Sequence, residues 1–372
     1  EELKEKQQFI KECEALLASE KKILAVIAGE LSDIKEKFGD DRRTRVIKGG
    51  VKQISDEDLI PNKESLLVFT AGGYVKRTDP SEYRSQKRGG VGVIDLETKE
   101  EDFVTDLVQT NTHSDLLFFT NLGRVYQIKM YDIPEGKRAT KGKSVMNFLS
   151  LGGEERVTSL LPMPKELKKE SGSLVLVTKN GTTKKVTAES FKDVRRSGII
   201  AIRLDKGDEL VSTVFVKKND DIIFASSRGQ SMRAKESDFR EMGRAAGGVR
   251  GMKLIKGDTI IGADVIRPED VEKGEFLVLG EHGIGKKTPL VEYKTQNRGG
   301  SGIKTAKVTE KTGKLIVARV VRGEESELIA MSKKGQVIRT DADSIPSLGR
   351  DTQGVTIMKL RAGDGIASVA FL

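Results

Sequence analysis

A pattern that recurs six times along the chain constrains the fold more than any other feature of the sequence. Each copy is a mostly apolar five-residue run, a turn glycine and a short basic stretch, and the runs begin near residues 66, 116, 174, 222, 276 and 328. The turn glycines, 48 to 58 residues apart, are Gly73, Gly123, Gly181, Gly229, Gly283 and Gly335. A second glycine follows each one after 17 or 19 residues, at Gly90, Gly142, Gly198, Gly248, Gly300 and Gly354. Two markers that keep step through six copies indicate repeated structural units.

Each repeat contains about four predicted strands. In the first, residues 66–70 and 74–78 form a hairpin around Gly73, and residues 91–96 and 103–108 supply two more strands. Units of this length with four strands are typical of propeller blades, and radial repetition leaves few exposed sheet edges. We therefore expect an all-β, six-bladed, propeller-like domain over residues 65–372. The usual WD and kelch signatures are missing, and the chain has no tryptophan.

Residues 1–38 predict one long α-helix of a different character. Apolar residues at alternating spacings of three and four form a heptad seam, interrupted only at Glu20, and Gly39 follows as a helix stop. A narrow seam of this kind is typical of a coiled-coil arm whose partner helix lies outside the chain, followed by a linker over residues 39–64. The alternative is an amphipathic helix docked on its own domain. The single cysteine, Cys13, excludes an internal disulfide and fits a reducing compartment.

Lysine and arginine recur in step with the repeat. The chain has 65 of them against 56 acidic residues, a net charge of +9. They stand directly after the turn glycines and again in the loop that follows, so one shared blade geometry would bring them onto a common band around the disc. The positions in this predicted rim are Lys76, Arg77, Arg84, Lys129, Lys137, Arg138, Lys141, Lys143, Lys184, Lys185, Arg195, Arg196, Arg233, Arg240, Arg244, Lys286, Lys287, Lys294, Arg298, Arg339 and Arg350.

A curved basic band suits duplex DNA, which it would hold by the phosphates without reading bases. Bending a site by 40–90° costs about 1–6 kcal/mol, so phosphate contacts must offset that cost and affinity should fall steeply with salt. Two other functions stay open. One is a scaffold for protein partners on which the basic rim is incidental, and the other is an enzyme with a site in the central channel, for which we find no supporting residues. No apolar run reaches the length of about 18 residues that a spanning helix needs, so we expect no membrane association.

Several segments resemble the C-terminal part of the A subunit of DNA gyrase, a type IIA topoisomerase. Gln86-Lys87-Arg88-Gly89-Gly90-Val91-Gly92 is similar to the GyrA box of that family, Gln-Arg-Arg-Gly-Gly-Lys-Gly, and stands in the first repeat, where the box belongs. The stretch from Asp58 to Arg77 resembles the family's entry into its first blade, and residues 1–45 resemble the descending arm of its coiled coil. The resemblance covers essentially the whole chain.

This resemblance implies a β-pinwheel, a propeller relative in which neighbouring blades exchange strands, and a domain that wraps DNA around its rim with a positive crossing. It also implies a bacterial protein that is located in the cytoplasm and associated with the nucleoid. There it would belong to an A2B2 heterotetramer, in which the rest of the gyrase A subunit forms a homodimer and binds the gyrase B subunit. The parent enzyme would introduce negative supercoils by ATP-dependent strand passage, using ATP and Mg²⁺ in other domains. The box would hold the wrap between the first and last blades. The equivalent domain of topoisomerase IV is the alternative within the family.

Some motifs depart from the family pattern or imitate other sites. Lys87 and Val91 stand where the family has Arg and Lys, so the box has lost one guanidinium fork and one cation. Residues 296–302 are a degraded second copy of the box, which we interpret as repeat ancestry. Residues 280–287 nearly spell a P-loop, but Lys287 replaces the Mg²⁺-binding hydroxyl, so we expect a hairpin turn. No tyrosine follows an arginine, as the family's cleavage tyrosine does, so the chain has no expected catalytic residue, cofactor or metal of its own.

Overall fold

The computed structural model describes residues 1–40, 56–82, 93–94, 102, 104–137, 140–164, 171–323 and 327–371. The chain divides into two compact units, Glu1–Ser55 and Asp56–Leu372. The division falls inside the segment expected to be a linker, and the short helix α3 (Asp56–Leu59) opens the second unit.

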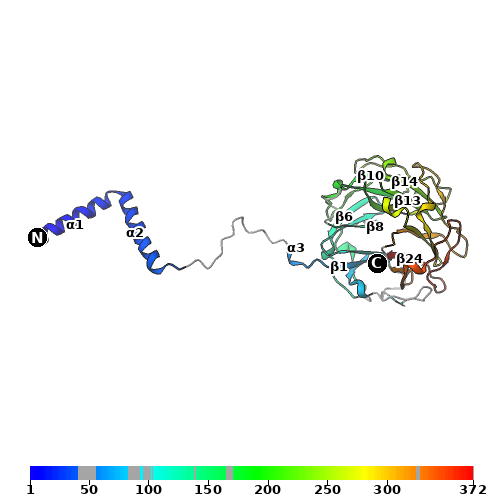
Figure 1. Ribbon diagram of the computed structural model, residues 1–372, viewed down its shortest axis with the longest axis horizontal. Helices are drawn as coiled ribbons and strands as arrows, with labels where there is room; N and C mark the ends of the chain where they lie inside the picture. The colour runs from blue at the N-terminus through cyan, green and yellow to red at the C-terminus, as the bar shows by residue number, and fades with distance from the viewer. Residues whose placement is uncertain are drawn as a thin grey trace. The chain divides into compact units, whose positions relative to one another are not determined.

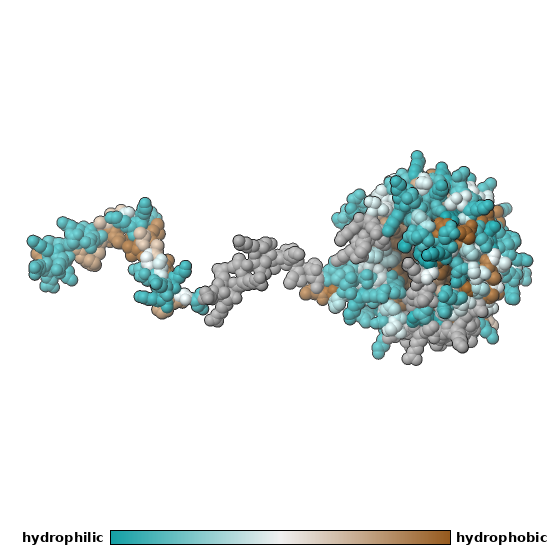
Figure 2. Space-filling model, in the orientation of Figure 1, coloured by the Kyte–Doolittle hydropathy of each residue, from teal (hydrophilic) through white to brown (hydrophobic). Residues whose placement is uncertain are grey.

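The first unit contains two helices, α1 (Glu2–Leu17) and α2 (Glu20–Phe38), so the prediction of one continuous helix was wrong. Ser19 leaves the helical conformation at φ −137° and ψ 106° and becomes the N-cap of α2. Serine favours that position because its side chain competes with the helical backbone. The break lies beside Glu20, which interrupts the apolar seam. The seam residues are exposed, with Leu17 at 72% and Phe38 at 79%, and Figure 2 shows apolar patches along the helices. Neither of these helices is both long and apolar enough to cross a membrane.

The second unit is a closed ring of six four-stranded antiparallel sheets (Figure 1). The hairpin of each repeat forms the middle of a sheet, and a long strand from the same repeat forms one edge. The opposite edge is a two-residue strand from the following repeat, and the last sheet receives its edge strand, β3, from the first repeat. The prediction of a six-bladed, all-β propeller with exchanged strands is therefore confirmed, and the last exchange joins the first repeat to the last sheet.

The strands fall into four sets. The hairpins pair β1 (Glu64–Thr70), β5 (Asp115–Thr120), β9 (Ser173–Thr178), β13 (Asp221–Ser226), β17 (Glu275–Gly280) and β21 (Glu327–Ser332) with β2 (Tyr74–Thr78), β6 (Arg124–Lys129), β10 (Thr182–Thr187), β14 (Gln230–Lys235), β18 (Ile284–Pro289) and β22 (Gln336–Asp341). The long edge strands are β4 (Val104–Asn111), β8 (Val157–Met163), β12 (Leu210–Val216), β16 (Ile260–Ile266), β20 (Leu315–Val321) and β24 (Ile366–Phe371). The exchanged strands are β3 (Val93–Ile94), β7 (Lys143–Ser144), β11 (Ile199–Ile200), β15 (Val249–Arg250), β19 (Ile303–Lys304) and β23 (Val355–Thr356).

Short 3₁₀ turns complete the elements. They are η1 (Pro80–Glu82), η2 (Met130–Asp132), η3 (Val145–Asn147), η4 (Ala188–Phe191), η5 (Glu236–Asp238), η6 (Pro268–Asp270), η7 (Leu290–Glu292) and η8 (Ala342–Ser344).

The core lies between neighbouring blades, which explains the uninterrupted apolar runs of the sequence. Side chains alternate between the two faces of a strand, so a strand buried on both faces needs apolar residues throughout. In β9, Leu174 and Leu176 pack toward the second blade, whereas Val175 and Val177 pack toward the fourth. Six such clusters, one between each pair of neighbours, surround the ring.

Glycines admit the exchanged strands. Gly302 and Gly354 immediately precede β19 and β23 with φ of +74° and +95°. A Cβ on Gly354 would lie 2.3 Å from the carbonyl oxygen of Gly285 in the preceding blade, so only glycine allows this approach. In the fifth repeat, this structural role belongs to Gly302 and not to Gly300, the residue that the spacing had marked. The P-loop imitation is a hairpin turn between β17 and β18, with Gly283 at φ +78°, as expected.

Candidate nucleic-acid interface

In the described part of the ring, the exchanged strands and the loops that lead into them form the outer part of the blades, opposite the long strands that line the axis. Because the ring is closed, equivalent positions in these loops lie on a common circle. Several predicted rim residues are exposed there. They are Lys137, Lys143, Arg195, Arg196, Arg240, Lys294 and Arg298, of which Arg196 pairs with Asp132 at 2.8 Å. These side chains form the cationic outer surface that the sequence predicts for the described part of the ring.

Three predicted rim lysines are instead almost completely buried. Lys76, Lys184 and Lys286 are 1%, 0% and 0% exposed, and their ammonium groups donate to backbone carbonyls. Each stands on the second hairpin strand beneath a loop from the next repeat. Their expected contact with phosphate does not fit this burial, because the surrounding protein occupies the space that a phosphate would need.

Burial also alters the protonation of two of these lysines. Removal from water, together with nearby Arg244, lowers the pKa of Lys184 to about 8. Removal from water lowers the pKa of Lys286 to about 8, although Glu292 and Asp351 oppose the change.

The next position along the same strand is also occupied within the fold. Arg233 pairs with Asp221 at 2.7 Å, and Lys287 pairs with Glu275 at 2.7 Å. Lys185 with Glu236, Arg339 with Glu327, and Arg77 with Glu135 are the equivalent pairs in other blades. Most of these acidic partners lie on the neighbouring hairpin strand or the turn that follows, so these cations tie each blade together. Their assignment to a phosphate-binding rim does not fit these pairs.

The remaining predicted residues are half-buried or lie outside the described residues. Lys129 pairs with Asp115 at 3.1 Å, and the ammonium of Lys141 lies 3.8 Å from the ring centre of Tyr74. Arg244 donates to the carbonyl of Ile200 at 2.5 Å. Arg350 lies 3.5 Å from Glu292. Outside the described residues lie Arg84, Arg138 and the whole box, Gln86, Lys87, Arg88, Gly89, Gly90, Val91 and Gly92.

Sequence reasoning missed a second set of exposed cations. Arg203, Lys253, Lys307 and Lys359 each stand five residues after a glycine with positive φ that precedes an exchanged strand. Arg250 on β15 and Lys304 on β19 are exposed as well, and Lys304 pairs with Asp351 at 3.3 Å. The constant spacing from Gly198, Gly248, Gly302 and Gly354 was the signal that could have identified the first four. Together with the loop residues, they extend the cationic outer surface across the exchanged strands.

The degraded box is seated on the preceding blade. The amide of Gln296 donates to the carbonyl of Arg233 at 2.7 Å, and that of Gly299 donates to the carbonyl of Gly251 at 2.5 Å. Gly299 and Gly302 both have positive φ. This segment therefore forms a turn that is hydrogen-bonded to the preceding blade.

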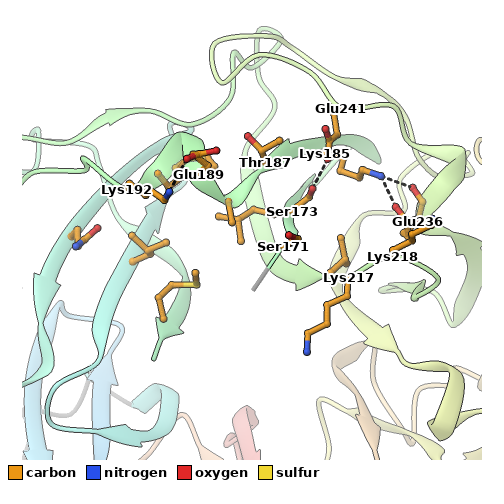
Figure 3. Close-up of a pocket in the computed structure, with 18 residues that line it drawn as sticks. Ser171, Ser173, Lys185, Thr187, Glu189, Lys192, Lys217, Lys218, Glu236 and Glu241 are labelled. Carbon is orange, nitrogen blue, oxygen red and sulfur yellow. Dashed lines mark hydrogen bonds and ion pairs between the residues drawn. The ribbon is translucent and has the colours of Figure 1, made fainter. Parts of the chain in front are cut away.

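The described part of the ring also contains cavities. One of about 630 Å³, between the second and third blades, is lined by charged and hydroxyl side chains over an apolar floor (Figure 3). Within it, Lys185 pairs with Glu236, and Lys192 pairs with Glu189 at 2.7 Å (Figure 3). Ser173 donates to Glu241 at 2.7 Å. The arrangement offers surface for binding and forms no nucleophile–base pair among the residues drawn.

The second cavity, of about 380 Å³, lies at the axis and is lined by all six long strands. Its charged lining residues are Asp106 and Arg319. Burial raises the pKa of the Asp106 carboxyl, and the Arg319 guanidinium only partly offsets this effect. Among the residues that the structure describes, no three His, Cys, Asp or Glu side chains gather as metal ligands do.

A closed ring of six strand-exchanging blades with cations along its outer edge defines a propeller-class domain suited to a polyanion. Comparison with known proteins identifies the family. The family model described as "DNA gyrase C-terminal domain, beta-propeller" matches residues 64–111, 114–162, 172–217, 220–267, 274–322 and 326–372, one segment for each blade. The chain therefore belongs to the family of DNA gyrase A C-terminal domains.

Relatives and solved structures agree with this assignment. The chain is 41% identical over 363 residues to the DNA gyrase A subunit of Staphylococcus epidermidis, and 40% identical over 362 residues to that of Staphylococcus aureus strain MRSA252. These matches cover 98% and 97% of the chain, which spans 40% of each relative. A solved DNA gyrase A C-terminal domain matches 83% of the chain and 100% of its own, with a TM-score of 0.74 and 27% identity. The C-terminal domain of a DNA topoisomerase IV shares the fold, with a TM-score of 0.64 at 22% identity, over 84% of the chain and 94% of its own.

Proposed function

We propose that this chain binds duplex DNA along the outer edge of the ring and wraps it, as the C-terminal domain of a gyrase A subunit. The observation that carries the proposal is the placement of exposed cations at equivalent positions of the exchanged strands and loops. A closed ring turns these positions into a curved track, and lysine and arginine side chains on such a track contact phosphates without reading bases.

The wider role follows from the family. The parent gyrase A subunit, as a homodimer with two copies of the gyrase B subunit, would use the wrap to introduce negative supercoils in the bacterial cytoplasm, at the nucleoid. ATP and Mg²⁺ would act through other domains and the partner protein. Helices α1 and α2 would join the coiled-coil arm of the parent protein, where a partner helix would cover their exposed apolar residues.

The box has a specific task in this proposal. Residues 86–92 directly precede β3, the strand that pairs with β22 of the last blade, through Ile94 with Gln336 and Val93 with Val337. A cationic segment at this point would hold DNA where the first and last blades meet. We expect the double change Lys87→Gln and Arg88→Gln to abolish wrapping and to leave weak DNA binding, because the other blades keep their cations.

Topoisomer analysis tests wrapping directly. Closed circular DNA is relaxed by a topoisomerase in the presence of the chain and then deproteinised, and we expect a shift toward positive linking number. The triple change of Lys253, Lys307 and Lys359 to Gln should reduce the shift and lower the slope of log affinity against log salt by about 0.9 for each lost phosphate contact. The triple change of Lys21, Lys22 and Lys35 on α2 removes the same charge outside the ring and should leave both unchanged. Unshifted topoisomers, or affinity indifferent to salt, would refute the proposal.

A further inference from the structure

Three buried lysines occupy one position of the blade. Lys76, Lys184 and Lys286 are the third residues of β2, β10 and β18, and each lies opposite the apolar centre of the preceding strand, at Val68, Leu176 and Val278. The lysines belong to the first, third and fifth blades, so the position alternates around the ring. A charge at this depth is not explained by direct contact with DNA, because the side chains are covered by protein.

The ammonium groups donate hydrogen bonds to carbonyls in the loop of the following repeat. Lys184 donates to the carbonyls of Arg244 and Ala246 in that loop, the latter at 3.2 Å, and also to the carbonyl of Ala201 in its own repeat at 2.5 Å. Lys76 donates to the carbonyls of Lys137 at 3.3 Å and Thr140 at 3.0 Å. Lys286 does the same at Gly349 and at Arg350, the latter at 2.6 Å. A buried ammonium is retained only when such oxygens replace its lost water, so each lysine and its loop hold one another.

The sheet itself does not require lysine at this position. The equivalent residues of the second, fourth and sixth blades are Tyr126, Met232 and Ile338, and all three are buried. An uncharged side chain is therefore compatible with the same strand position and register. In the lysine blades, carbonyls of the covering loop accept hydrogen bonds from the ammonium at this position.

The loops held in this way carry cations of the proposed interface. The loop above Lys76 contains Lys137 and leads into Lys143 on β7. The loop above Lys184 contains Arg240 and Arg244 and leads into Arg250 on β15. Resting on the proposed DNA-binding function, we propose that Lys76, Lys184 and Lys286 are positioning residues. They fix these loops so that the exposed cations of the loops contact phosphate in one arrangement, and the three buried lysines do not touch DNA.

A positioning role and a direct contact differ in their salt dependence. A lysine that contacts phosphate contributes about 0.9 to the slope of log affinity against log salt, because its binding releases a counterion. A positioning lysine leaves the number of phosphate contacts unchanged and alters only the cost of ordering the loop on DNA. We therefore expect K184M to weaken DNA binding about tenfold at a fixed salt concentration with an unchanged slope.

The experiment compares K184M and K286M with the control K218M, which removes the same charge from an exposed lysine beside the cavity of Figure 3. Methionine is the residue of the fourth blade at this position, and thermal unfolding checks that each variant folds. Binding to a duplex of random sequence is measured across a salt series. Hydrogen exchange of the Ala246 amide, which donates to Gly243 at 3.0 Å, reports the loop without DNA, and we expect it to accelerate in K184M and not in K218M.

The outcomes separate the alternatives. Faster loop exchange with weaker binding at an unchanged slope supports the positioning role. A slope reduced by about 0.9 would show direct phosphate contact and overturn it. Unchanged exchange and affinity in both folded lysine variants would overturn it as well. If the unaltered chain fails to bind DNA, the proposed function fails, whereas the exchange experiment still decides whether these lysines hold their loops.

Discussion

The two lysines with lowered pKa make the stability of the ring depend on pH in an unusual direction. Lys184 has a pKa of about 8 in the folded chain, against the ordinary value of 10.5 that it regains on unfolding. Between these values the unfolded chain binds a proton that the folded chain does not. The free energy of unfolding therefore rises with pH through this window, since stability increases with pH wherever the unfolded state binds more protons.

The magnitude follows from the distance between the two pKa values. At about 1.36 kcal/mol per pH unit, Lys184 adds about 3 kcal/mol of stability once the pH has passed from below 8 to above 10.5. About 2 kcal/mol of this appears between pH 7 and pH 9.5. Lys286 has the same folded pKa of about 8 and should behave alike, although nearby Glu292 and Asp351 favour its charged form.

Urea unfolding of matched variants isolates this contribution from all other titrating groups. The free energy of unfolding is measured from pH 7 to pH 9.5 for the unaltered chain, K184M and K218M. We expect the difference between the unaltered chain and K184M to move by about 2 kcal/mol in favour of the unaltered chain as the pH rises. The difference from K218M, whose lysine is exposed, should stay constant. A difference from K184M that is flat or moves the other way would refute the burial argument.

Two further predictions concern the framework. Gly283 and Gly335 have nearly equal φ of +78° and +76°, but a Cβ on Gly283 would lie 2.3 Å from the carbonyl oxygen of Met358, whereas a Cβ on Gly335 meets no atom within 4 Å. Gly335→Ala should lower the free energy of unfolding by about 1–2 kcal/mol because of its backbone conformation alone, and Gly283→Ala should lower it clearly more. Equal losses in urea unfolding would contradict the steric argument. Phe118 is 0% exposed and lies between the first and second blades. Phe118→Ala should lower the free energy of unfolding by about 3–5 kcal/mol, and a loss below 1 kcal/mol in thermal unfolding would mean that this interface repacks.

Much of the ring could be read from the sequence because its core imposes a local pattern. A strand packed on both faces requires an unbroken apolar run, and a tight hairpin requires glycine, so both signals recur with the blade. The helix break at Ser19 was missed because a heptad seam describes which face is apolar and does not describe whether the backbone continues. Glu20, the one residue out of pattern, marked the place.

The candidate interface was harder to predict because exposure is decided by distant segments. Lys184 and Arg240 are both basic residues that recur with the repeat. The loop some 60 residues after Lys184 buries that lysine, whereas Arg240, which lies in the same loop, is exposed. The repeat held a usable signal, since Met232 and Ile338 occupy the position of Lys184 in other blades and mark it as buried. Lys253 was missed because its place depends on the exchanged strand before it, whose partner lies in another repeat.

The first and last blades meet at an outer contact, the pairing of β3 with β22, and at an inner contact, a cluster of apolar side chains. Among the residues that the structure describes around it, the exchanged strand β3 joins the last sheet through two residue pairs. The inner contact is larger, because Leu66 and Val68 of the first blade pack with Ile329 and Met331 of the last in one buried cluster. Burial of side chains of this size stabilises the contact by about 1.5–3 kcal/mol each, so the apolar cluster holds the ring closed. Substitutions in residues 86–92 should therefore leave the fold intact, and a loss of wrapping in such variants would report on DNA held at the outer edge and not on an opened ring.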